Sequence, residues 1–100
     1  MAFESSALDA TLAAAAGDDP SLLVELRNAF RESFEHQVDL LARARCDGNW
    51  NIAAMRLKGL AASFQVGTLM DLAEEALEAA PGDPVILRKF HAALGEFVAG

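Results

Sequence analysis

The sequence predicts an all-α domain, and three features of its composition and pattern carry that prediction. Alanine is abundant and tyrosine is absent, while valine, isoleucine and threonine, which favour strands, are few. Apolar residues recur at every third or fourth position, which is the spacing of one face of a helix. Short segments with glycine, proline and aspartate separate these periodic runs. Because short connections make successive helices antiparallel, we expect an up-down antiparallel four-helix bundle with a short additional N-terminal helix.

The size of the chain agrees with one domain. Its 100 residues, of which 53% are hydrophobic, suffice to bury one core, so we expect a single helical bundle domain over residues 1–100. No segment approaches the roughly 20 apolar residues that a membrane-spanning helix needs. The sequence has a single cysteine and no leader that combines a basic region with a long apolar run, so we expect a cytoplasmic protein.

The first two helices have clear boundaries in the sequence. A short helix is predicted over residues 6–16, where alanines surround two leucines and Gly17 stops the helix. Asp19 and Pro20 then supply an N-cap and a first-turn proline for a long amphipathic helix over residues 20–45.

The remaining helices follow at short intervals. Residues 46–49 break the long helix through an Asp-Gly turn, and Asn49 is the predicted cap of the next helix. That helix covers residues 52–67, and the one after it ends before Pro81. Asp83, followed by a proline, repeats the cap-and-proline arrangement for the last helix.

The apolar stripes of these helices define the predicted core. Each stripe contributes residues that repeat at three- or four-residue spacing and that face the centre of a bundle. The core residues predicted in this way are Leu26, Phe30, Phe34, Leu57, Phe64, Leu72, Phe90 and Leu94.

The helix over residues 52–67 has two chemically different faces. At about 100° per residue, its core face carries Ala53, Leu57, Leu60, Ala61 and Phe64, and its other face carries Met55, Lys58, Gly59, Ala62 and Val66. A flexible thioether, a glycine and an alanine are unusual on a solvated face. A glycine inside a helix destabilises the helix by about 1 kcal/mol relative to alanine. Gly59 therefore indicates that another group approaches the helix closely at this position.

The same helix carries a resemblance to a known family. Residues 55–59, Met-Arg-Leu-Lys-Gly, resemble the His-x-Leu-Lys-Gly signature of histidine-containing phosphotransfer (HPt) domains. Phe30 and Phe34 precede the signature on a long helix, and Leu69 and Leu72 follow it on the next, as in that family. The resemblance covers nearly the whole chain and implies the helical bundle of HPt domains.

Three positions depart from the family pattern. Met55 replaces the phosphorylated histidine, Leu60 a serine, and Gln65 a small glycine near the phosphoryl site. A thioether lacks the nucleophilic lone pair with which imidazole carries a phosphoryl group. The resemblance therefore implies a degenerate HPt domain that docks a response-regulator receiver domain or a histidine kinase without carrying phosphate. The docking face is predicted to comprise Met55, Lys58, Gly59, Ala62, Gln65 and Val66.

Other residues that could carry chemistry are predicted to be incidental. His36 and His91 are isolated on helix surfaces, and Cys46 lies at a helix end. The acidic side chains of residues 71–78 have no histidine beside them and indicate a solvated helix face. We therefore expect no catalytic residue, no metal, no cofactor and no enzymatic activity.

The net charge of −7 limits the kinds of partner that the chain is expected to bind. It disfavours nucleic acid and anionic membranes, which require clustered excess lysine and arginine. A protein partner is expected, and two classes of function stay open. One is the degenerate HPt domain; the other is a generic helical interaction or dimerisation module unrelated to phosphorelays, in which a homodimer is possible. A phosphocarrier that uses another residue is a third, weaker alternative.

Overall fold

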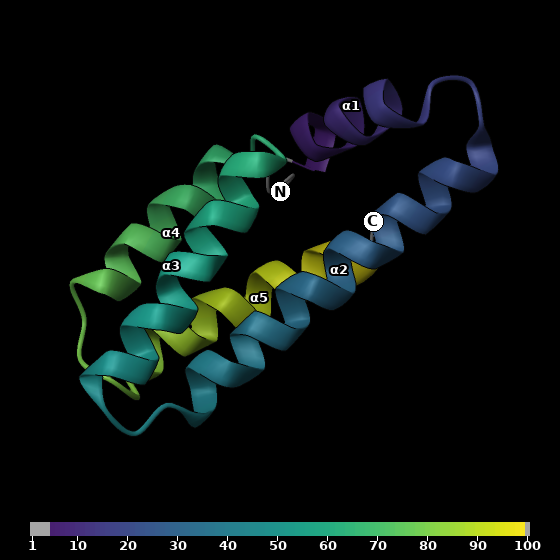
Figure 1. The fold of residues 1–100 in the computed structure, drawn as a ribbon. Coiled ribbons are helices and arrows are strands. Elements are labelled where there is room, and N and C mark those ends of the chain that lie inside the picture. Colours follow the sequence, from purple (N-terminus) through teal and green to yellow (C-terminus); the bar gives the residue numbers. More distant parts are fainter. Residues whose placement is uncertain (1–4, 100) are drawn as a thin grey trace.

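A computed structural model describes the backbone of residues 5–99 and the side chains of residues 9–95. Over this part of the chain the secondary structure consists of five α-helices, without a strand. The helices are α1 (Ser5–Ala16), α2 (Pro20–Arg43), α3 (Asp47–Ser63), α4 (Gly67–Leu77) and α5 (Pro84–Ala99) (Figure 1). The prediction of an all-α fold is confirmed.

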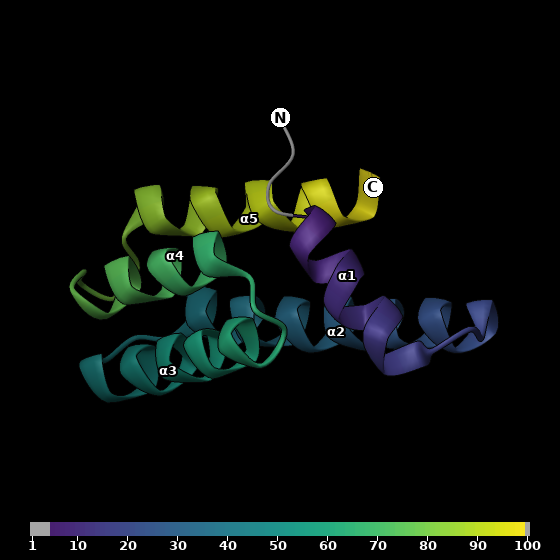
Figure 2. The ribbon, with the colours of Figure 1, turned by 90° about the horizontal axis from the view of Figure 1, so that it is seen from above.

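The helices form a bundle-like body around the long helix α2. Helix α3 packs against α2 and α4, and α5 packs against α4 and α2. Helix α1 packs against α2 and folds back over the beginning of that helix (Figures 1 and 2). Seen from above, α2 and α3 lie in one layer and α4 and α5 in another (Figure 2). Each of the four helices α2 to α5 therefore contributes one face to a shared core.

Aromatic side chains join these helices at the centre. The ring of Phe30 lies nearly parallel to that of Phe34, with 5.9 Å between the ring centroids. It also packs edge to face with the ring of Phe64, with 4.7 Å between the centroids. Phe34 also contacts Phe90 of α5 at 6.0 Å. Of the eight predicted core residues, the buried ones are Phe30, Phe34, Leu57, Leu72 and Phe90, and the half-buried ones are Leu26, Phe64 and Leu94.

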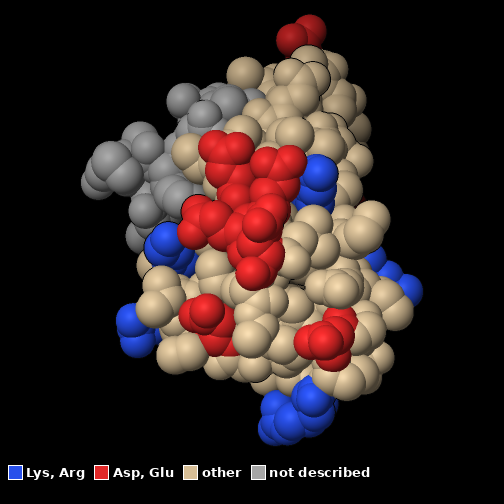
Figure 3. Space-filling model, turned by 90° about the vertical axis from the view of Figure 1, so that its left-hand side faces the viewer, with Lys and Arg blue, Asp and Glu red and all other residues tan. Residues whose placement is uncertain are grey.

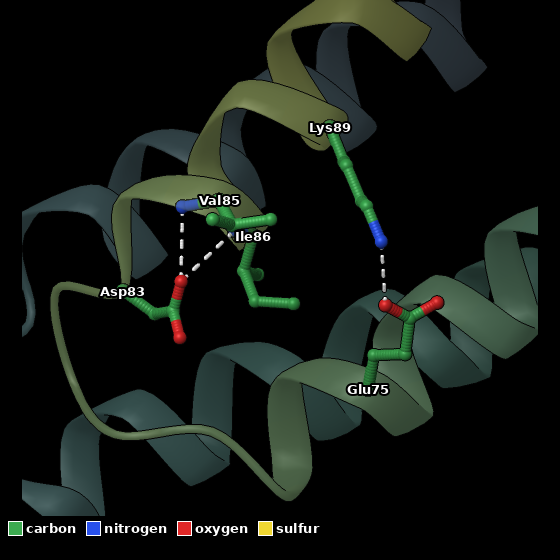
Figure 4. A network of polar contacts seen from close by, with 5 residues as sticks. All are labelled: Glu75, Asp83, Val85, Ile86 and Lys89. Carbon is green, nitrogen blue, oxygen red and sulfur yellow. Dashed lines mark hydrogen bonds and ion pairs between the residues drawn. The ribbon is translucent and has the colours of Figure 1, made fainter.

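Two helices begin with the caps that the sequence predicts. The Asp19 carboxylate accepts hydrogen bonds from the backbone N–H groups two and three residues later, at 3.0 and 3.2 Å. Asp83 accepts the equivalent pair at 2.9 and 3.3 Å (Figure 4). Each aspartate thus satisfies donors that have no partner inside the helix. Gly17 ends α1 with a φ of 66°, a conformation that favours glycine.

The boundaries of α3 correct the sequence prediction. Asn49 is not its cap, because α3 already begins at Asp47 and its N-cap residue, Cys46, makes no side-chain cap hydrogen bond. A tertiary contact holds the first turn instead. Trp50 is completely buried, and its ring N–H donates to the backbone carbonyl of Ala76 at 2.6 Å. At its other end α3 stops at Ser63 and does not continue to residue 67.

Candidate docking face on helix α3

Helix α3 presents one buried side and one open side, as its sequence pattern predicts. Ala53, Leu57 and Ala61 are each at most 3% exposed and pack in the core. Met55, in the middle of the helix, is 61% exposed. Gly59 and Ala62 are also exposed, and they lie one and two turns beyond Met55. The three residues form an open strip of small and apolar surface.

Gly59 has no steric role within the described part of the chain. Apart from the helix's own backbone, a Cβ atom built at this position would meet no atom within 4 Å, so the space above Gly59 is open. The backbone at Gly59 is helical and does not require a glycine. The residue nevertheless costs the helix about 1 kcal/mol relative to alanine. The packing of the chain itself therefore does not explain why this position is a glycine.

Lys58 lies at the edge of the strip, on the side of α4. Its ammonium group forms an ion pair with the Glu74 carboxylate at 3.1 Å, and both side chains are about half exposed, at 41% and 54%. Exposed ion pairs contribute little to stability, typically about 0–1 kcal/mol. Lys58 can therefore leave Glu74 for a carboxylate of a partner at little cost to the fold.

The last two residues of the predicted face, Gln65 and Val66, lie beyond the end of α3 and differ in their exposure. Gln65 has a φ of 58°, and its N–H donates to the Ala62 carbonyl, while the Val66 N–H donates to the Ala61 carbonyl at 2.9 Å. This hydrogen-bond pattern is the Schellman motif, which reverses the chain after a helix. Gln65 remains exposed.

Val66 is a correction to the predicted face. The prediction extended α3 to residue 67 and so placed Val66 on its open side. Because the chain turns at Gln65, Val66 is completely buried instead, next to the buried Ala61. An apolar contact of this kind commonly accompanies the Schellman motif. The face therefore consists of Met55, Lys58, Gly59, Ala62 and Gln65, without Val66.

The predicted docking face has an exposed neighbour on α3 that the sequence prediction did not include. Ile52 is 53% exposed and lies one turn before Met55 on α3. It also borders a hollow of about 430 Å³ between α2 and α3, whose walls include Arg43 and Arg56. The i, i+3 spacing of Ile52 and Met55 is the signal in the sequence that could have identified this extension of the face.

The histidines and the cysteine lie outside this face. His36 is exposed on α2 and His91 is exposed on α5, so neither side chain lies on the helix that carries Met55. Cys46 is a free, exposed thiol before the first turn of α3. In the described part of the chain, no side-chain hydrogen bond or ion pair joins any of these three residues to Met55, Gly59 or Ala62.

The acidic residues of α4 gather into one patch on the side of the molecule where α3 and α4 lie (Figure 3). Its members, Asp71, Glu74, Glu75 and Glu78, are all exposed, as expected for a solvated face. Glu74 pairs with Lys58, and Glu75 pairs with Lys89 at 2.8 Å (Figure 4). Among the described residues, no group of three or more His, Cys, Asp and Glu side chains is arranged to hold a metal ion.

None of the described helices is both long and apolar enough to cross a membrane. Comparison with models of protein families, with curated proteins and with solved structures finds no match to this chain. Membership of the HPt family therefore stays a prediction from the residues quoted above.

Proposed function

We propose that this chain is an HPt-like signalling domain that docks a receiver domain, or a histidine kinase, of a two-component phosphorelay without carrying the phosphoryl group. In this proposal α2 to α5 are the up-down antiparallel four-helix bundle of that family, and α1 is the additional helix. The domain acts in the cytoplasm, where receiver domains are expected, and modulates the relay by occupying its partner.

The open strip at Met55, Gly59 and Ala62 is the observation that carries the proposal. It lies on α3 at the position of the family signature, and it combines an exposed thioether with a glycine that the packing of the chain does not require. A helix with small residues on its exposed face admits the backbone of a partner at short distance, while a flexible methionine adapts to the partner's surface. Both properties suit protein docking.

The chemistry of position 55 supports a role without phosphotransfer. Phosphoryl transfer requires a nucleophile that attacks phosphorus in line and later leaves, and a methionine sulfur is no such nucleophile at a phosphoryl group. His36 and His91 lie on other helices than Met55, on α2 and α5. A receiver that docks at Met55 thus finds no acceptor there.

A second candidate function is a helical dimerisation module unrelated to phosphorelays. The observation that favours it is further exposed apolar surface away from α3, at Val24 with 58% and Leu22 with 37% exposure, both near the start of α2. Two copies that cover this surface would form a homodimer, for which Met55 and Gly59 would be irrelevant. The two functions therefore predict different effects of changes on α3.

The test is a titration of the chain with receiver domains and histidine kinases of the same genome, followed by calorimetry. Gly59→Glu places a large charged side chain on the open strip and should weaken binding at least about tenfold, or about 1.4 kcal/mol. Gly95→Glu is the matched control, because Gly95 is another exposed helical glycine, on α5, and a Cβ atom built there would likewise lie in open space. It should leave affinity unchanged.

Circular dichroism of both variants should match the wild-type chain, since neither glycine takes part in the core. The proposal fails if Gly59→Glu leaves every receiver and kinase interaction unaffected. A dimer in sedimentation experiments that Gly59→Glu does not disturb, together with no binding of any receiver or kinase, would instead support the dimerisation module.

A further inference from the structure

A hollow of about 430 Å³ lies between the C-terminal part of α2 and the N-terminal part of α3. Its volume falls within the range of ligand sites in proteins, about 300–1,000 Å³. The apolar lining comes from Leu40, Ala44, Ala53 and Ile52. Ala44 and Ala53 are 5% and 3% exposed and form part of the core, whereas Ile52 is 53% exposed. An aliphatic side chain placed in the hollow would cover chiefly the exposed Ile52 and the half-buried Leu40.

Two arginines provide positive charge at the walls of the hollow. Arg43 pairs with Asp39 at 3.1 Å through Nε only, and its side chain is 75% exposed. Arg56 is exposed, and among the described residues it has neither a hydrogen bond nor an ion pair. The planar guanidinium group of arginine presents several donors in a geometry that matches a carboxylate.

This local charge contrasts with the rest of the molecule. The chain carries a net charge of −7, and four of its fifteen acidic residues lie along α4 and its C-cap, in the patch of Figure 3. Arg45, two residues after Arg43, is also exposed and adds a third cation at the end of α2. A cationic hollow on an anionic domain attracts a carboxylate, while the surrounding surface repels one.

We infer that the hollow between α2 and α3 binds an acidic peptide segment of the partner protein, with an aliphatic side chain in the hollow and a neighbouring carboxylate on Arg56. The inference rests on the proposed function, because it assumes that a protein partner covers the strip at Met55. On α3, Ile52 lies three residues before Met55 and four before Arg56, and Gly59 lies four residues after Met55, so the hollow and the strip adjoin each other.

The binding chemistry favours a peptide over the simpler occupants. A small carboxylate alone would use the arginines but leave Ile52 and Leu40 exposed to water. A purely aliphatic segment would leave Arg56 without a partner and gain nothing from the positive charge. A segment that alternates acidic and aliphatic side chains satisfies both parts of the hollow, and its affinity should fall as salt screens the charges.

The experiment titrates the full chain with a short capped peptide that alternates glutamate and leucine, followed by ¹⁵N NMR. The backbone amides of Ala44, Ile52 and Arg56, which line or adjoin the hollow, should shift. Arg56→Glu should weaken binding at least about tenfold, as expected when a charge pair becomes repulsive. Arg88→Glu is the control, since Arg88 is an exposed arginine on α5 and the change in net charge is the same. It should alter affinity less than about twofold.

Four results of the titration would overturn the inference, and a fifth comes from the chain without a ligand. They are equal binding of a lysine and leucine peptide, shifts confined to other surfaces, no response to Arg56→Glu, and the same shifts with acetate alone, which would indicate an anion site only. Shifts that appear on concentrating the chain without peptide would assign the hollow to a second copy and would also overturn it. Because this titration contains no receiver, its failure leaves the calorimetric test of the proposed function unaffected.

Discussion

Gln65 occupies a backbone conformation that suits glycine better, and replacing it should stabilise the fold. Its φ of 58° lies in the left-handed region, where a side chain with a Cβ atom costs about 1–2 kcal/mol. Glycine removes this cost but has more freedom in the unfolded chain, which offsets about 0.5–1 kcal/mol. The Gln65 side chain is exposed, so little packing is lost. Gln65→Gly should therefore raise the free energy of unfolding by about 0.5–1 kcal/mol.

For a domain of this size, 1 kcal/mol corresponds to about 4–8 °C, so the Tm of Gln65→Gly should rise by about 2–8 °C. Thermal unfolding followed by circular dichroism measures this change. Gln65→Ala is the control, because it shortens the side chain but keeps the Cβ atom, and it should give no comparable rise. An equal rise in both variants would show that the gain comes from the lost side chain and not from the backbone.

A fall in Tm for Gln65→Gly would contradict the backbone conformation on which the prediction rests, and not only its magnitude. It would mean that the chain does not turn through the left-handed conformation at this residue. The burial of Val66 depends on that turn, since Val66 follows Gln65 in the Schellman motif. The same measurement therefore tests whether Val66 is absent from the docking face.

The remaining predictions concern the core, the open strip and phosphotransfer. Phe34→Ala should lower the free energy of unfolding by about 3–5 kcal/mol in denaturant titrations, because the ring is completely buried. Gly59→Ala should raise it by about 1 kcal/mol if nothing inside the chain requires the glycine, and a loss of stability would show a hidden contact. A phosphorylated receiver should transfer no phosphoryl group to the chain, and acid-labile label on the protein would contradict this. Met55→His alone should restore little transfer, whereas combining it with Leu60→Ser and Gln65→Gly supplies the shape and polarity that the signature has in HPt domains.

Local features of the sequence suffice for much of the fold. Asp19 and Asp83 each stand before a proline, and both form the predicted caps because a capping hydrogen bond spans only two or three residues. The apolar stripes correctly identify Phe34 and Leu57 as core, since a helix that must bury one face has few ways to orient it. The exposure of Met55 follows from the same periodicity.

Tertiary contacts decide what periodicity leaves undetermined, above all where a helix stops. The apolar stripe of α3 runs to Phe64 and does not mark the end of the helix, but the chain turns at Gln65 and the turn leaves Val66 completely buried. The start of α3 likewise depends on the buried contact of Trp50 with Ala76, 26 residues away. The ion pair of Lys58 with Glu74 joins two helices whose relative position no local pattern specifies. The sequence thus determined which residues share a helix face, and only the packing of the helices decided which of these residues are exposed on it.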